Sequence, residues 1–154
     1  MILVTLGTQK EPFTRLLDYI ENSNIEEEII VQNGHTLYES KKMKLINFTT
    51  YNEMEEYIKN ARVIITHAGT GSVLTPLKKG KKIIVCARQK KYEEHIDDHQ
   101  LELVEVFKDG GYVLELNENN SLDDLLQEIK EFKPAKYKSN TKKFLAKLLE
   151  EIEK

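Results

Sequence analysis

The sequence predicts an α/β fold built on a doubly wound parallel sheet. Short apolar runs alternate along the chain with segments whose apolar residues recur every three or four positions, as strands alternate with helices. Several of the runs are apolar without interruption, which is typical of strands buried on both faces of a parallel sheet. Strand–helix–strand units of this kind form right-handed crossovers and place helices on both faces of the sheet.

Six strands are expected, each a short apolar run closed by a turn residue or a polar loop. Gly7 ends the first run, and Asn33 with Gly34 ends the second with the chemistry of a tight turn. The run at 63–65 is apolar throughout, which indicates burial on both faces. The expected strands are residues 2–6, 28–31, 43–48, 63–65, 83–85 and 112–116.

Helices are expected between these strands. Pro12 suits the first position of the first helix, where its missing N–H would have no partner in any case. Asn52 is expected to cap the second helix, with Glu55 three residues later as in a capping box. The third helix is expected to begin at Ser72, although Pro76 inside it removes an early backbone hydrogen bond.

Three further helices complete the pattern. The first of them ends at Gly110, and Ser121 is expected to cap the next. Pro134 then breaks the chain, and the C-terminal helix is expected over residues 135–154. The whole chain of 154 residues and 17.9 kDa has the size of a single domain, expected over 1–154.

Composition and charge exclude several classes of protein. The 23 Lys and Arg residues nearly balance 26 Asp and Glu, so the net charge is −3 and bulk attraction to nucleic acid is excluded. The single cysteine, Cys86, excludes a disulfide framework and a cysteine-based zinc site, and four histidines form no apparent metal cluster. No run approaches the roughly 20 apolar residues of a membrane span, and no basic signal-peptide region opens the chain, so a cytoplasmic protein is expected.

Ligands of such Rossmann-like sheets bind beyond the carboxyl ends of the strands, so the loops after the strands are the candidate sites. The most informative is the loop at 66–72, Thr-His-Ala-Gly-Thr-Gly-Ser, which follows a buried strand and opens a helix. Glycines let a ligand approach the backbone, and a helix start offers free N–H groups with a partial positive charge. This combination predicts an anion site, most naturally for a diphosphate, although a tight turn without a ligand has the same appearance.

Two familiar phosphate-binding loops do not fit this segment. The Gly-Lys-Ser/Thr ending of a P-loop is missing. Leu74 stands where the dinucleotide fingerprint needs its third glycine, which argues against a nucleotide-binding oxidoreductase.

A second candidate is the long polar loop and helix start at 88–100. His99 and Gln100 carry donors and acceptors that suit sugar hydroxyls, while Asp97 or Asp98 can serve simply as a helix cap. The stretch 78–91 holds seven basic residues and no acidic one. A solvated lysine-rich face is the favoured interpretation, and a patch that faces a partner or an anionic membrane is the alternative.

These motifs together resemble one family. The segments His-Ala-Gly-Thr-Gly-Ser at 67–72, Gly-Lys-Lys-Ile-Ile-Val at 80–85 and Asp-His-Gln at 98–100 are similar to the donor-binding half of glycosyltransferase family 28, and 4–8 and 32–34 are similar too. The resemblance covers residues 1–116 and is to the small stand-alone form, found in the eukaryotic dolichol-linked GlcNAc transferase and in bacterial exopolysaccharide and capsule synthesis. The segment 88–100 looks especially like the bacterial branch.

The resemblance implies the C-terminal half of a GT-B glycosyltransferase, which binds a UDP-sugar without a metal or other cofactor. It places the donor phosphates on Gly7, Thr8, His67, Gly69, Thr70, Gly71 and Ser72. It places the nucleoside near Phe48, Thr50, Tyr51 and Thr75, and the donor sugar near Asp98, His99 and Gln100. Family members often carry a ribose-binding Glu where this chain has Thr75 followed by Pro76.

The resemblance also implies a catalytic subunit of a heteromeric, inverting hexosyltransferase of bacterial exopolysaccharide or capsule synthesis. A membrane-anchored partner would bind the lipid-linked saccharide acceptor, recruit this chain to the inner face of the membrane and complete the active site. The general base is left unassigned, and the partner can supply it. The alternative is a non-catalytic nucleotide-sugar-binding or regulatory subunit, for which Thr75-Pro76 is the main support.

Overall fold

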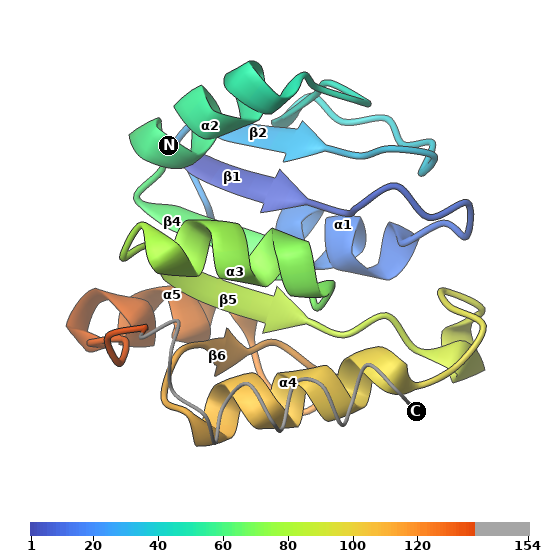
Figure 1. The fold of residues 1–154 in the computed structure, drawn as a ribbon. Coiled ribbons are helices and arrows are strands. Elements are labelled where there is room, and N and C mark those ends of the chain that lie inside the picture. The colour runs from blue at the N-terminus through green and yellow to red at the C-terminus, as the bar shows by residue number, and fades with distance from the viewer. Residues whose placement is uncertain (138–154) are drawn as a thin grey trace.

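The computed structural model describes residues 1–137 and contains a six-stranded, wholly parallel sheet of order β3-β2-β1-β4-β5-β6 (Figure 1). This is the doubly wound order of dinucleotide-binding folds, so the predicted fold class is confirmed. The strands are β1 Ile2–Thr5, β2 Ile29–Gln32, β3 Met43–Leu45, β4 Val63–His67, β5 Lys82–Cys86 and β6 Leu114–Glu115. The helices are α1 Thr14–Glu21, α2 Tyr51–Asn60, α3 Thr70–Lys78, α4 His99–Asp109 and α5 Leu122–Glu131, with a short 3₁₀ helix at Lys90–Tyr92.

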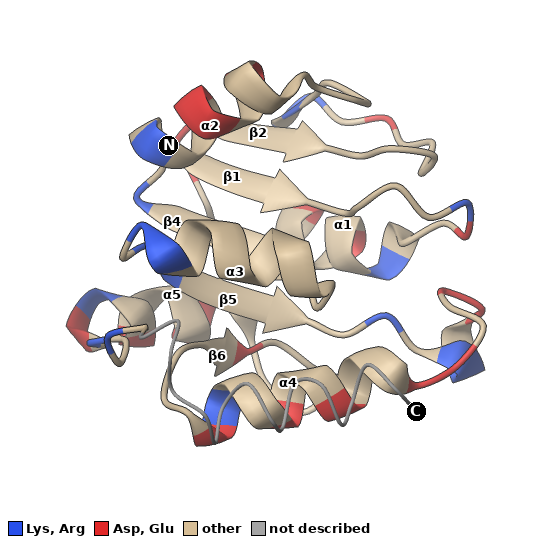
Figure 2. Cartoon of the chain, in the orientation of Figure 1, with Lys and Arg blue, Asp and Glu red and all other residues tan. Residues whose placement is uncertain are grey.

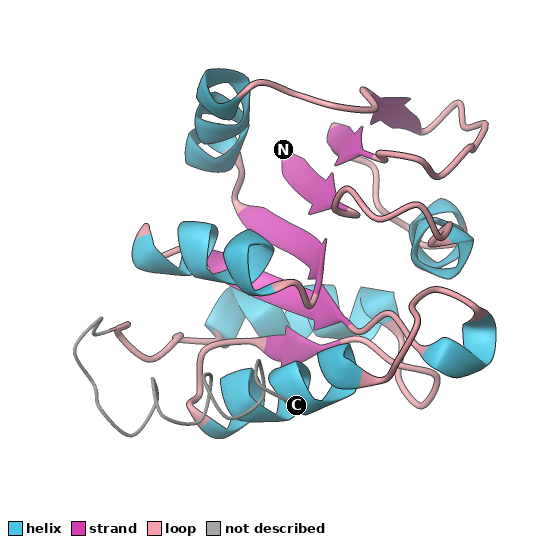
Figure 3. Ribbon diagram, turned by 45° about the vertical axis from the view of Figure 1, so that its right-hand side comes forward, coloured by secondary structure: helices cyan, strands magenta, loops and turns pink. Residues whose placement is uncertain are grey.

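Helices cover both faces of the sheet (Figures 1 and 3). Helices α1 and α5 pack on one face, and α2, α3 and α4 pack on the other. Successive strand residues point to opposite faces, so Ile2 and Val4 belong to the first core and Leu3 to the second. Burial on both faces explains why the strand segments are apolar without interruption.

Most charged residues lie on the helices and connecting loops, and β1, β2 and β4 carry none (Figure 2). Within residues 1–137, no helix combines the length and the apolar character that crossing a bilayer would require. The same residues contain no group of three or more His, Cys, Asp or Glu placed to hold a metal ion.

Three strands are shorter than predicted. Strand β1 ends at Thr5 instead of residue 6. Strand β3 ends at Leu45 instead of residue 48, and Asn47 shortly after it adopts a left-handed conformation with φ 53°, which an extended strand does not allow. Strand β6 keeps only Leu114 and Glu115 of the predicted 112–116.

Helix starts differ from the predictions at three places. Helix α1 begins at Thr14 with Phe13 as its N-cap residue, so Pro12, expected at the first helical position, lies before the helix. Thr50, not Asn52, caps α2: its hydroxyl accepts a hydrogen bond from the Glu53 N–H, and the Glu53 carboxylate accepts one from the Thr50 N–H, 3.1 Å each. Helix α3 begins at Thr70, two residues before the expected Ser72, and contains Pro76. The prediction for Ser121 is confirmed, because its hydroxyl accepts a hydrogen bond from the Asp124 N–H at the start of α5.

The predicted C-terminal helix over 135–154 falls mostly outside the described residues. Residues 132–137 follow α5 and form neither helix nor strand. The remainder, 138–154, lies beyond the part of the chain that the structure describes.

Candidate functional site

The candidate site lies where the direction of the sheet's connections reverses. From β1 the chain continues to β2 on one side, and from β4 it continues to β5 on the other, so loops diverge at the carboxyl ends of these two strands. Such a switch point leaves a crevice in which doubly wound sheets bind ligands. The two strand ends are joined by a 2.6 Å hydrogen bond from the Thr5 hydroxyl to the Thr66 hydroxyl oxygen.

The glycine loop after β4 opens directly into α3. Gly69 is the N-cap residue, and no side chain among the described residues caps its helix. The first-turn N–H groups of α3 therefore remain available to an anion, and the helix dipole favours negative charge at the same place. Apart from its chain neighbours and the backbone of its own helix, a Cβ added to Gly71 would meet no described atom within 4 Å, so the space beside the first turn is open.

His67, the last residue of β4, holds the glycine loop from within. Its Nδ1 accepts hydrogen bonds from the Gly69 N–H and from Nε2 of Gln100, 3.2 Å each. The ring proton is therefore assigned to Nε2, which lies 3.0 Å from the Ser72 hydroxyl. Burial, together with repulsion from Arg88 and His95, lowers the pKa of His67 to about 3, so the imidazole is neutral.

Gln100 connects the ends of β4 and β5. Its side chain is buried, and Oε1 accepts hydrogen bonds from the backbone N–H groups of Ala68 and Arg88, 3.0 Å each. Its Nε2 faces Nδ1 of His67. Both polar atoms are thus engaged within the protein, and the expected contact of Gln100 with the donor sugar stays a prediction.

The loop after β1 closes the other side of the crevice. Gly7 has φ +83°, and a Cβ there would lie 2.6 Å from Nε2 of His67, so only glycine fits. The amide of Gln32 holds this loop: Oε1 accepts from the Gly7 N–H at 3.2 Å, and Nε2 donates to the carbonyls of Gly7 and Asn47 at 3.1 Å. The neighbouring Thr8 is exposed.

A pocket of about 190 Å³ adjoins the start of α3 and lies between α2 and α3. It brings together four of the predicted residues, namely Tyr51 and Thr75 for the nucleoside and Gly71 and Ser72 for the phosphates. The other lining residues are Leu3, Thr5, Gln32, Met54, Glu55, Ile58, Ile64 and Pro76. Sequence reasoning did not assign Gln32 or Glu55 to the site, although 32–34 was noted as a loop that resembles the family.

Two predicted nucleoside residues lie outside this lining. Phe48 is half exposed and packs edge-on against His35, with ring centroids 5.2 Å apart. The Thr50 side chain caps α2. Both residues are close in sequence to Tyr51, but only Tyr51 of the segment 48–51 lines the pocket.

The predicted donor-sugar residues gather at the start of α4. The Asp98 carboxylate accepts a 2.9 Å hydrogen bond from the Lys90 N–H, so it holds the loop. The Asp97 carboxylate accepts a hydrogen bond from the His99 N–H at 2.9 Å, so Asp97 binds the first backbone N–H of α4. Nε2 of His99 is buried and has no partner among the described residues.

Comparison with solved structures places the fold among GT-B glycosyltransferases. The glycosyltransferase SnogD from Streptomyces nogalater superposes with a TM-score of 0.54 at 16% identity, covering 86% of this chain and 40% of that chain. The solution NMR structure of ALG13 gives a TM-score of 0.62 at 19% identity and covers 99% of this chain and 96% of that chain. At these identities the likeness concerns the fold alone.

The chain belongs to the glycosyltransferase family 28 C-terminal domain family, whose model matches residues 1–153. Among curated proteins, it is 30% identical over 108 residues to the UDP-N-acetylglucosamine transferase subunit ALG13 of Saccharomyces cerevisiae, covering 70% of this chain and 48% of that protein. The subunit of the same name from Candida albicans is 32% identical over 81 residues, covering 53% and 26%. The chain therefore spans about half the length, or less, of these relatives.

Proposed function

We propose that this chain is the donor-binding, catalytic subunit of a UDP-sugar-dependent, inverting glycosyltransferase that works with a second subunit. The observation that carries the proposal is the uncapped N-terminus of α3, which opens beside the pocket between α2 and α3 at the switch point of the sheet. Membership of the family supports the reaction class.

In this proposal the uridine enters the pocket and the diphosphate lies at the first turn of α3. Tyr51 offers an exposed ring at the pocket for the uridine, and Thr75 faces the ribose. The open space at Gly71 admits the diphosphate close to the backbone N–H groups. The proposal assigns no metal ion, because the helix terminus supplies the positive potential.

The reaction proposed is a single displacement at the anomeric carbon. The acceptor oxygen bonds to this carbon while its bond to the UDP oxygen breaks, so UDP departs with the electron pair and the configuration inverts. The helix terminus stabilises the charge that develops on the diphosphate. His67 does not take the acceptor proton in this scheme, because its Nδ1 lone pair already accepts two hydrogen bonds and Nε2 carries a proton. We assign the general base to the partner.

The partner that we propose is a membrane-anchored subunit that binds a lipid-linked saccharide acceptor and brings this chain to the cytoplasmic face of the membrane. The names of the curated relatives, which describe subunits of a UDP-N-acetylglucosamine transferase, support an assembly of this kind and make UDP-N-acetylglucosamine the first donor to test. The bacterial exopolysaccharide or capsule setting has its support in the segment 88–100, whereas these relatives come from yeasts.

A non-catalytic nucleotide-sugar-binding subunit is the second candidate. Thr75 and Pro76 favour it, because Thr75 lines the pocket at the position where family members often carry a ribose-binding carboxylate. A missing ribose contact would weaken donor binding without altering the phosphate site.

Calorimetric titration and a transfer assay test these proposals. UDP is expected to bind at least about tenfold more tightly than UMP, because the second phosphate reaches the helix terminus. UDP-sugars are then tested for transfer with the chain alone, the partner alone and both together. Absence of UDP binding would overturn both candidates, whereas binding without transfer in any combination would favour the non-catalytic subunit.

A further inference from the structure

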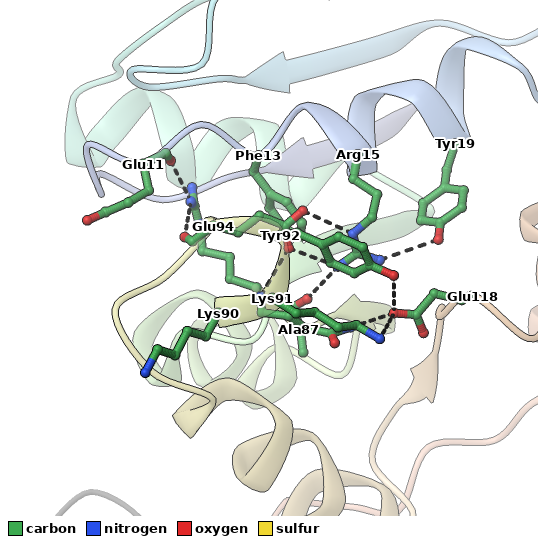
Figure 4. Close-up of polar contacts among 12 residues, drawn as sticks. Glu11, Phe13, Arg15, Tyr19, Ala87, Lys90, Lys91, Tyr92, Glu94 and Glu118 are labelled. Atoms are coloured by element: carbon green, nitrogen blue, oxygen red, sulfur yellow. Dashed lines mark hydrogen bonds and ion pairs between the residues drawn. The ribbon is translucent and has the colours of Figure 1, made fainter.

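A buried ion pair lies behind the candidate site, on the face of the sheet that α1 covers (Figure 4). Arg15 of α1 donates from Nε and Nη2 to the two carboxylate oxygens of Glu94, 3.0 Å each, in bidentate geometry. Nη2 also donates to the Ala87 carbonyl at 2.9 Å, and Nη1 donates to the Tyr19 hydroxyl at 3.3 Å. Tyr92 stacks on the guanidinium, whose Cζ lies 4.5 Å from the ring centroid.

The burial of this pair calls for an explanation beyond stability. The Glu94 side chain is 3% exposed and that of Arg15 is 15% exposed. Apolar side chains of similar volume often stabilise a fold as well as a buried ion pair does, because both charges must lose their water. A bidentate pair does, however, fix the relative position of the two segments that carry it. Here those segments are α1 and the loop between β5 and α4.

Glu94 also holds the first residues of that loop. Its carboxylate accepts a hydrogen bond from the Gln89 N–H at 3.0 Å, and its own N–H donates to the Gln89 carbonyl at 3.1 Å. Its carbonyl accepts from Nη1 of Arg88 at 3.0 Å. Arg88, only 1% exposed, donates further to the carbonyls of Leu6 and Glu11 in the loop after β1.

Hydrogen bonds connect this loop to the glycine loop. The backbone N–H of Arg88 donates to Oε1 of Gln100, which also accepts from the Ala68 N–H. Nε2 of Gln100 faces His67, and His67 holds Gly69 and Ser72. Each link is a hydrogen bond of 3.0 to 3.2 Å between buried or half-buried groups.

We propose that Arg15 and Glu94 are positioning residues: their ion pair holds the loop between β5 and α4, and through Gln100 and His67 it holds the glycine loop in the geometry that binds the nucleotide. This inference rests on the proposed function, since it assigns UDP to the glycine loop. The physical reason is preorganisation. A loop already held in its bound geometry loses less conformational freedom when the ligand arrives.

The test combines UDP titration with amide hydrogen exchange on Glu94→Gln. This variant keeps an oxygen for the Gln89 N–H but removes the charge that pairs with Arg15. At a temperature where circular dichroism shows the variant to be folded, its UDP affinity is expected to fall about tenfold or more, because displaced binding groups contact the ligand less well. The amides of Ala68, Gly69 and Arg88 are expected to exchange at least about tenfold faster, as local opening becomes easier.

Two further variants complete the design. Glu27→Gln removes one partner of the Arg62–Glu27 pair, which is also bidentate but joins segments at the amino ends of β2 and β4, and should leave UDP affinity and those three amides unchanged. Arg15→Lys keeps one charge-assisted contact but loses the fork, so an intermediate loss is expected. If Glu94→Gln does not fold, the same measurements are made on Arg15→Lys instead.

UDP titration and hydrogen exchange together distinguish a failure of the positioning role from a failure of the proposed function. Wild-type affinity and exchange in Glu94→Gln would overturn the positioning role, and so would an equal effect of Glu27→Gln. If the wild-type chain itself fails to bind UDP, the proposed function falls, while the exchange of Ala68 and Gly69 still decides whether the pair holds the glycine loop.

Discussion

The side-chain amide of Gln100 lies 3.2 Å from Nδ1 of His67, and its N–H directs the imidazole proton to Nε2. The glycine loop therefore depends on a neutral histidine that donates to Ser72 and accepts from Gly69. A protonated ring would turn Nδ1 into a donor that faces two other donors. Charge and hydrogen bonding thus act together to keep His67 neutral.

The first prediction concerns the protonation of His67. Its pKa is lowered to about 3 by burial and by repulsion from Arg88 and His95, against about 6.5 in an unfolded chain. NMR chemical shifts of the ring should stay constant from pH 8 to pH 5 and keep the pattern of the Nε2–H tautomer. A titration with a midpoint near 6.5 would contradict the hydrogen-bond assignment.

The same pKa difference predicts an acid-dependent loss of stability. Between about pH 6.5 and about pH 3 the unfolded chain binds a proton at His67 and the folded chain does not, so this contribution to the free energy of unfolding falls as pH falls. Urea unfolding at pH 7.5, 6, 5 and 4 measures the slope. In His67→Gln the slope should be smaller across this window. Parallel slopes for the two proteins would show that His67 does not titrate on unfolding.

Gly71 and Gly69 form a matched pair of substitutions. Gly71→Val should fold with unchanged stability, because outside its own helix no described atom lies within 4 Å of its Cβ position. It should nevertheless bind UDP at least about tenfold more weakly, because its side chain enters the phosphate space. Gly69→Ala should weaken UDP binding and, unlike Gly71→Val, should also lower the thermal unfolding midpoint, because its Cβ would clash with the ring of His67. Calorimetry and thermal unfolding distinguish the two effects. Undiminished UDP binding by Gly71→Val would remove the diphosphate from this turn.

Thr75 offers a gain-of-binding prediction. Thr75 lines the pocket at the position where family members often carry Glu, so Thr75→Glu should bind UDP about tenfold more tightly, the value of one charge-assisted hydrogen bond to a ribose hydroxyl. The gain should vanish with 2′,3′-dideoxy-UDP, which lacks those hydroxyls. A gain that persists with the dideoxy compound, or no gain at all, would place the ribose elsewhere.

The cap of α2 allows a stability test with an internal control. Thr50→Ala should lower the free energy of unfolding by about 1 kcal/mol, because it removes the acceptor for the Glu53 N–H. Asn52→Ala lies two residues further on, inside the helix, and should change the stability little. Denaturant unfolding of both variants decides between them. A larger loss in Asn52→Ala would restore the cap predicted from the sequence.

Local patterns predicted most of the architecture. The uninterrupted apolar run at 63–65 lies in β4, at the centre of the sheet, and Ser121 caps α5 as its position before an apolar helix indicated. Thr50 shows where such patterns fail. Thr50 and Asn52 are both good caps followed three residues later by Glu, so the local signal could not distinguish Thr50 with Glu53 from Asn52 with Glu55.

For the candidate site, local patterns indicated the loops but not the long-range hydrogen bonds that hold them. Glycines after a strand allow a close approach to the backbone, so the sequence indicated the loops of Gly7, Gly69 and Gly71, and their contact with the donor phosphates stays a prediction. The hydrogen bonds that hold these loops were not predicted, because the bonded residues are distant in the chain. Gln32 bonds to Gly7 across 25 residues, and Arg15 bonds to Glu94 across 79.

The sequence by itself determined the alternation of strands and helices and the loops at which a ligand can approach, since apolar spacing and glycine act between near neighbours. Only the tertiary structure decided which partners the buried polar side chains bind. Gln100 was expected to face a sugar, and the fold shows its amide between Ala68, Arg88 and His67. Burial leaves each polar atom dependent on a partner, and folding alone brings that partner within hydrogen-bond distance.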